Sequence, residues 1–121
     1  MVTVQEYTKM LLEVEGVGSY LLMRIDGRIL SHNVTDPDGL SSLLAITGMG
    51  IKKIQKGLGF HHFEHLLIRR DNKENLVLLQ IGNTLLGVMQ KPNSACSELL
   101  QGLARIQELA STKNNRNPAT T

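Results

Sequence analysis

The 121-residue sequence has few aromatic side chains and a single cysteine. Two phenylalanines, two tyrosines and no tryptophan are few for the base stacking used by readers of single-stranded nucleic acid. The lone cysteine, Cys96, excludes an intrachain disulfide, and such sparing use of cysteine is typical of a reducing compartment. We therefore expect a cytoplasmic protein that binds no nucleic acid.

Long apolar runs and a strong excess of one charge are also lacking. No run approaches the roughly 20 apolar residues of a membrane-spanning helix, so we expect no membrane insertion. The net charge of +2 is too small to predict binding to a charged surface. The length suits a single core. We expect one domain over residues 1–111 and a disordered tail over residues 112–121, which has no apolar face.

The order of sequence patterns predicts an α+β fold. Asp26-Gly27 and Gly82-Asn83 each separate two apolar runs, which is typical of a β-hairpin, and we expect both residues of the Asp-Gly turn to have positive φ. Helical spacing and end signals mark three helices. The expected strands cover residues 19–25, 28–34, 60–70, 76–81 and 84–90. The expected helices run from Thr3 to before Gly16, from Pro37 to the stop at Gly57 and Gly59, and over residues 94–110. In the order α-β-β-α-β-β-β-α, these elements predict a five-stranded antiparallel sheet within a three-layer α/β/α sandwich.

The stretch His61–His65, "HHFEH", contains the H-x-x-E-H pattern of one class of zinc peptidases. That chemistry requires a helix, whereas the nearby glycines and the short run favour a strand. On a strand, His61 and His65 would lie about 13 Å apart, too far to ligate one zinc ion. We therefore expect no metal site and no cofactor. A metal- or small-molecule-sensing domain that uses this cluster is the alternative function.

No set of residues resembles a catalytic site. Cys96 has no partner close in sequence, and no pair of carboxylates stands out as an acid–base couple. We expect a protein that is not an enzyme and has no catalytic residue.

The middle helix has apolar residues on two sides. The first side is expected to pack on the sheet and comprises Leu40, Leu43, Leu44, Thr47, Ile51 and Ile54. Opposite it lie Ile46 and Met49, beside Ser42, Ala45 and Lys53. Gly48 and Gly50 each cost a helix about 1 kcal/mol relative to alanine, but they permit close approach of another backbone. This pattern predicts a second partner for the helix.

The strand over residues 60–70 is rich in histidine and arginine, which is typical of a sheet edge. An edge of this kind can also pair with one specific partner strand. Together with the second side of the middle helix, it predicts a homodimer in which the middle helices pack together and the edge strands join across a two-fold axis.

Three stretches carry a resemblance to a known family: "GVGSYLLMRIDGRILSHNV", "GLSSLLAITGMGIKKI" and "LVLLQIGNTLLGVMQKPNSACSELL". In order and spacing, residues 3–110 resemble the roadblock family, which is named from a dynein light chain and includes prokaryotic regulators of Ras-like GTPases. The resemblance implies a ten-stranded sheet in a homodimer that acts as a non-enzymatic platform for a small GTPase. By position, it implies that the platform is lined by Ser42, Ile46, Met49, Lys53 and Lys56, and we add Ala45 to this interface.

The charged "HHFEH" strand and the polar tail differ from the dynein-associated members of that family. These departures favour a prokaryotic-type GTPase regulator over a motor-associated protein.

Overall fold

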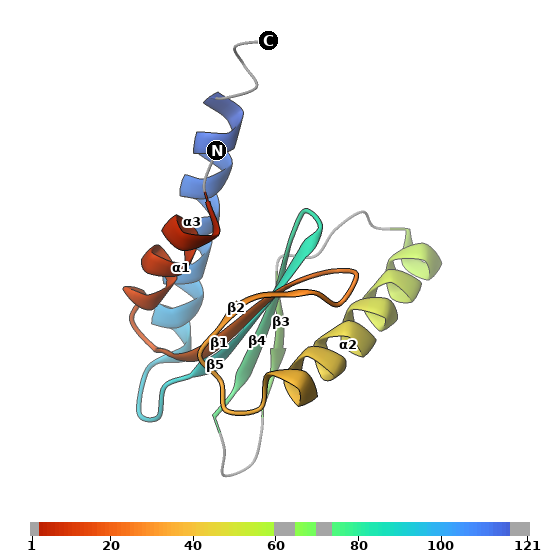
Figure 1. Cartoon of the computed structure of the whole chain (residues 1–121), viewed down its shortest axis with the longest axis horizontal. Coiled ribbons are helices and arrows are strands. Elements are labelled where there is room, and N and C mark those ends of the chain that lie inside the picture. The colour runs from red at the N-terminus through yellow and green to blue at the C-terminus, as the bar shows by residue number, and fades with distance from the viewer. Residues whose placement is uncertain (1–2, 60–64, 70–73, 117–121) are drawn as a thin grey trace.

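The computed structural model describes residues 3–59, 65–69 and 74–116 and contains the predicted elements in the predicted order (Figure 1). The elements are α1 (Val4–Leu12), β1 (Val17–Arg24), β2 (Ile29–His32), α2 (Pro37–Leu58), β3 (Leu66–Ile68), β4 (Leu76–Ile81), β5 (Thr84–Gln90) and α3 (Cys96–Arg116).

The five strands form one antiparallel sheet in the order β2-β1-β5-β4-β3. Helices α1 and α3 lie on one face of the sheet and α2 lies on the other, which confirms the three-layer α+β fold (Figure 1). The prediction that the third strand lies at a sheet edge is confirmed for Leu66–Ile68. The rest of the expected strand is either outside β3, as for His65 and Arg69, or outside the described residues.

Each central strand is apolar on both sides because a helical layer covers each face of the sheet. In β1, Tyr20 and Leu22 point toward α1 and α3, whereas Leu21 and Met23 point toward α2. This alternation follows from the two-residue period of a strand. It divides the core into two apolar clusters, one on either side of the sheet.

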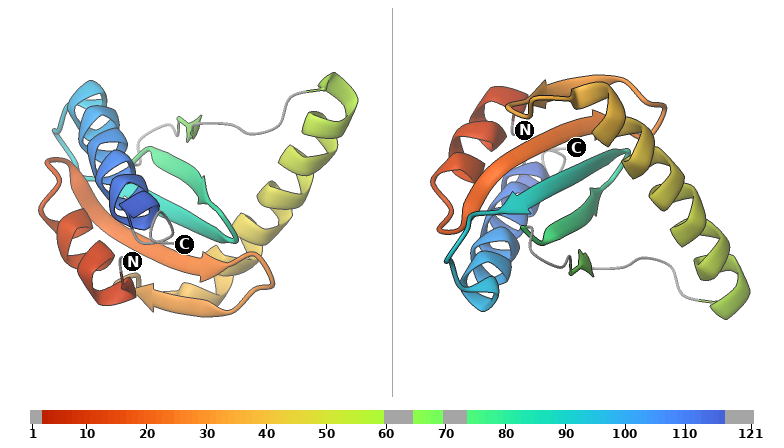
Figure 2. Two further views of the ribbon diagram at one scale, coloured as in Figure 1. Left: turned by 90° about the horizontal axis from the view of Figure 1, so that it is seen from above. Right: turned by 90° about the horizontal axis from the view of Figure 1, so that it is seen from below.

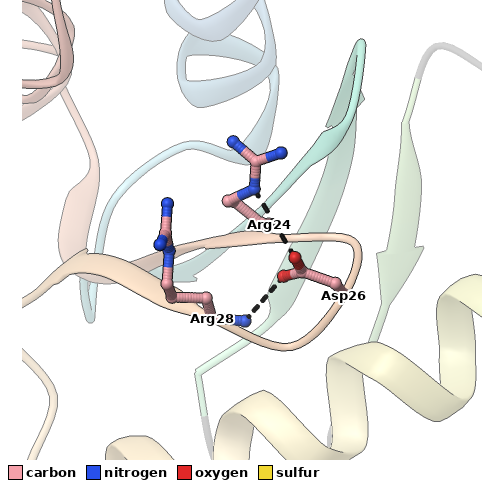
Figure 3. A network of polar contacts seen from close by, with 3 residues as sticks. All are labelled: Arg24, Asp26 and Arg28. Carbon is pink, nitrogen blue, oxygen red and sulfur yellow. Dashed lines mark hydrogen bonds and ion pairs between the residues drawn. The ribbon is translucent and has the colours of Figure 1, made fainter.

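The Asp26-Gly27 hairpin is confirmed, but its turn differs from the expected one. Only Gly27 has positive φ, at 102°, and the Gly27 amide donates to the Arg24 carbonyl over 2.9 Å. This geometry belongs to a three-residue loop that ends in a glycine, so the expectation of two residues with positive φ was wrong. The Asp26 carboxylate accepts a hydrogen bond from the Arg28 amide over 3.1 Å and lies 3.7 Å from Nε of Arg24 (Figure 3).

The helix ends follow local signals in the sequence. The capping box at the start of α1 is present, with the Glu6 amide donating to Oγ1 of Thr3 over 3.1 Å. Helix α3 begins at Cys96 and continues to Arg116, past the expected end at residue 110. The disordered tail over residues 112–121 stays a prediction.

Candidate protein-interaction surface

Helix α2 carries all six residues of the expected interface, so the way in which it packs on the sheet decides what they can contact. Asp36 caps the helix by accepting a hydrogen bond from the Gly39 amide over 3.1 Å, and Pro37 occupies the first turn. Gly59 closes the other end with a φ of 80°. The 22 residues between these caps span about 33 Å.

The inner face of α2 approaches the sheet closely because small residues alternate with large ones across the contact. A Cβ atom added to Gly87 of β5 would lie 2.9 Å from Cδ1 of Leu44, so the leucine fills the space over this glycine. A Cβ atom on Gly48 would lie 3.1 Å from Cδ1 of Leu85. Gly48 therefore serves packing within the chain, contrary to the expectation that it admits a second partner. Gly50 has no atom within 4 Å of an added Cβ and leaves open space beside the helix.

The sheet supports only part of α2. Leu40 and Leu58 are 18 residues apart, which is five full helical turns, so they point in the same direction from the helix axis. Leu40 is 9% exposed, whereas Leu58 is 76% exposed. Figure 2 shows the C-terminal part of α2 projecting beyond the sheet. Helix α2 thus extends beyond the part of the sheet that buries its inner face.

The residues predicted to form the interface are mostly accessible. Ile46 is 68% exposed and Met49 is 65% exposed, although both are large and apolar. Ala45 is half-buried and packs partly against the core beneath α2. The exposed members of the predicted set are Ser42, Ile46, Met49, Lys53 and Lys56.

Two residues assigned to the sheet-facing side of α2 lie on its surface instead. Leu43 and Ile54 are exposed, so the prediction that they belong to the core was wrong. The buried direction of the helix is set by Leu40, Leu44 and Ile51. At 100° per residue, Leu43 and Ile54 lie to one side of that direction. The large exposed apolar residues of α2, which we call the α2 outer surface, are Leu43, Ile46, Met49, Ile54 and Leu58. Leu58 is included because, although it points the same way as Leu40, it lies beyond the part of the sheet that covers the helix.

Positive charge flanks the α2 outer surface. Lys52, Lys53 and Lys56 are exposed, and the sequence contains no aspartate or glutamate from Gly39 to Gly59. Within the described part of the chain, no carboxylate forms an ion pair with these lysines. The arrangement combines apolar area with unpaired positive charge, which suits an acidic protein surface.

The histidine stretch provides no metal site that the structure can describe. His61, His62 and Glu64 lie outside the described residues. His65 is exposed and lines a hollow of about 480 Å³ between α3 and the β4 side of the sheet. Among the residues that are described, no three His, Cys, Asp or Glu side chains are placed to hold a metal ion.

The helices of the described residues lack the combination of length and apolar character that crossing a membrane requires.

Comparison with known proteins gives a likeness in structure rather than in sequence. No family model and no curated protein matches the sequence. Among solved structures, MglB of Myxococcus xanthus is similar with a TM-score of 0.75 and 15% identity, covering 96% of this chain and 95% of that one. The gliding protein MglB of Thermus thermophilus gives a TM-score of 0.72 and 20% identity, covering 86% and 82%. A Roadblock/LC7 domain from Streptomyces avermitilis gives 0.64 and 17%, covering both chains completely.

Proposed function

Because the chain has the roadblock fold, we propose that it is a non-enzymatic homodimeric scaffold that binds a small Ras-like GTPase and modulates its GTP hydrolysis. The α2 outer surface carries this proposal. A helix without a partner would expose mainly charged and polar residues here, whereas α2 exposes five large apolar side chains. The fold is similar to that of MglB proteins. This similarity agrees with the resemblance of the sequence, which implies a prokaryotic regulator of Ras-like GTPases.

Dimerisation would use two adjoining features of the chain. The α2 outer surface offers apolar area, and Gly50 offers the open space in which a second helix can approach the backbone. Within the described residues, strand β3 pairs with β4 along one side only, so its other side can accept the β3 strand of a second copy. A two-fold axis at this edge would join the two sheets into one of ten strands.

The lysines of α2 indicate the character of the GTPase surface. Lys53 and Lys56 lie on the same side of the helix as Met49, and Lys52 lies beside them. A matching surface on the GTPase would place carboxylates around an apolar centre. Binding would therefore weaken as salt screens the opposite charges.

The first experiment is the solution mass of the chain by light scattering, for the wild type and for Met49→Asp. We expect a wild-type dimer that dissociates in the variant, because a carboxylate would be buried against apolar side chains. Met49 is already exposed in the single chain, so the variant should keep its fold and its melting temperature. Val4→Asp is the matched control, since it adds the same charge to an exposed residue in the first turn of α1, where negative charge is tolerated.

The second experiment tests the GTPase directly. A Ras-like GTPase from the same genome, loaded with GDP or with a GTP analogue, is titrated with the wild type and with Lys53→Gln/Lys56→Gln. Tighter wild-type binding that weakens with added salt and in the double variant is the expected result. A wild-type monomer, or no binding of either nucleotide form at high micromolar concentration, would overturn the proposal.

A further inference from the structure

A second concave surface lies between α1 and α3. These two helices share the face of the sheet opposite α2 (Figure 2). The concave surface is a groove of about 480 Å³. Its apolar part is formed by Met10 and Val14 from the α1 side and by Ile106 and Leu109 from α3. Leu109 is 48% exposed, Met10 and Val14 are half-buried, and Ile106 is buried at the base, so the apolar part is open to solvent mainly at Leu109.

A glycine brings the two sides of the groove together. A Cβ atom on Gly102 would stand 2.5 Å from Cγ1 of Val14, so only a residue without a side chain lets the end of α1 approach α3 this closely. The contact holds the two walls at a set separation. The groove is therefore a built feature of the α1–α3 layer.

Among the described residues, three carboxylates line the groove together with a single cation. Glu13, Glu15 and Glu98 are exposed, and Arg105 is the one basic residue of the described lining. Within the described residues, these three glutamates form no ion pair. The groove is thus locally acidic in a chain whose net charge is +2.

The placement of two of these carboxylates does not help the helix that carries them. Glu13 caps the C-terminal end of α1, and Glu15 follows two residues later. The backbone dipole already makes that end negative, so acidic residues there are unfavourable and Lys9 in the last turn offsets them only in part. An external positive charge would relieve this concentration of negative charge.

We propose that the α1–α3 groove docks an amphipathic helix of another protein, with lysines or arginines bordering its apolar stripe. Apolar residues at helical spacing would cover Met10, Val14 and Leu109, and the bordering cations would meet the glutamates. The groove is separated from the α2 outer surface by the whole sheet, so both could be occupied at once. The inference does not depend on the proposed binding of a GTPase.

The test uses a labelled synthetic peptide of 18 residues, with leucines at helical spacing and lysines elsewhere, followed by fluorescence anisotropy. The control peptide replaces every lysine with glutamate. The wild type should bind the lysine peptide, and the triple variant Glu13→Gln, Glu15→Gln, Glu98→Gln should bind it about tenfold more weakly, from the combined loss of several exposed charge pairs. Asp38→Asn, which removes a carboxylate from the first turn of α2, is the matched control and should leave the affinity within about twofold.

Mapping the bound peptide by the amide chemical shifts of the labelled full chain decides where it sits. Shifts that cluster at Val14, Gly102 and Leu109 support the groove. The proposal is overturned if the shifts cluster on α2, if the triple variant binds as the wild type does, or if no binding occurs at high micromolar concentration. It is also overturned if the triple substitution lowers the solution mass of the peptide-free protein, because the occupant would then be a second copy of this chain.

Discussion

Replacing Tyr7 by phenylalanine should stabilise the protein, which is unusual for a change in a core. Tyr7 of α1 is buried among the apolar residues beneath α1 and α3, and its hydroxyl has no hydrogen-bond partner among the described residues. A buried hydroxyl without a partner costs about 1–3 kcal/mol of desolvation. Phenylalanine keeps the ring and removes that cost, so we expect a gain of about 1 kcal/mol in the free energy of unfolding.

Tyr20 provides the matched control from the same apolar cluster. Its hydroxyl lies 2.7 Å from the Ser31 hydroxyl, so it has the hydrogen bond that Tyr7 lacks. Tyr20→Phe should therefore lower the free energy of unfolding by about 1 kcal/mol. Urea unfolding at one fixed protein concentration measures both values, because a dimer would make stability depend on concentration.

The pH dependence of stability tests independently whether Tyr7 is buried as a neutral phenol. Burial raises the pKa of the Tyr7 hydroxyl far above its ordinary value near 10. In the unfolded chain this hydroxyl loses its proton above about pH 10, whereas in the folded chain it keeps it. The free energy of unfolding therefore keeps its full value with respect to Tyr7 below about pH 10, and it falls by about 1.4 kcal/mol per pH unit above that pH. Tyr7→Phe should lack this share of the decline between about pH 10 and 12.

Two results would refute the reasoning. If Tyr7→Phe lowers the stability by about 1 kcal/mol or more, the hydroxyl has a partner in solution. If the wild type and Tyr7→Phe lose stability in parallel above about pH 10, Tyr7 is not buried as a neutral phenol.

Two further pairs of variants test the seating of α2 and the backbone of the turns. In the background of Met49→Asp, which is expected to be monomeric, Leu40→Ala should cost about 2–3 kcal/mol and Leu58→Ala less than about 0.5 kcal/mol, because only the first leucine is covered by the sheet. Equal costs in urea unfolding would contradict the projection of α2. Gly57→Ala should raise stability by about 0.5–1 kcal/mol, since an added Cβ meets nothing within 4 Å in the helix. Gly27→Ala should lower stability by about 1–2 kcal/mol, since φ at this turn is 102°. Thermal unfolding compares the two glycine variants, and a loss at Gly57 would show that its surroundings are not open.

Local chemistry explains why much of the fold could be predicted from the sequence. The ends of α2 depend on Asp36, Pro37 and Gly59, whose capping roles require only neighbouring residues. The strands were predictable as a set because central strands covered on both faces are continuous apolar runs bounded by turns. Their limits moved by a few residues, and the Asp26-Gly27 turn took a longer form, because pairing with neighbouring strands decides where a ladder ends.

The candidate site was predicted in part for a related reason. Helical periodicity placed Ile46 and Met49 opposite the buried side of α2, and both are exposed. It assigned Leu43 and Ile54 to the core, because a period fixes relative directions around the axis but leaves the direction of the sheet uncertain by a residue or two. The glutamates of the α1–α3 groove carried no signal, since they come from two segments at opposite ends of the chain.

The sequence by itself determined the order of elements, the helix caps, the hairpins and the two-sided apolar strands, because each depends on interactions between residues close in the chain. Only the tertiary structure decided how far the sheet extends beneath α2. Leu40 and Leu58 are equivalent in the periodic pattern, yet one is covered and the other is open to solvent. A helical repeat specifies a direction from the axis at every turn. The finite width of the surface on which the helix lies determines which of those turns are buried and which are left for a partner.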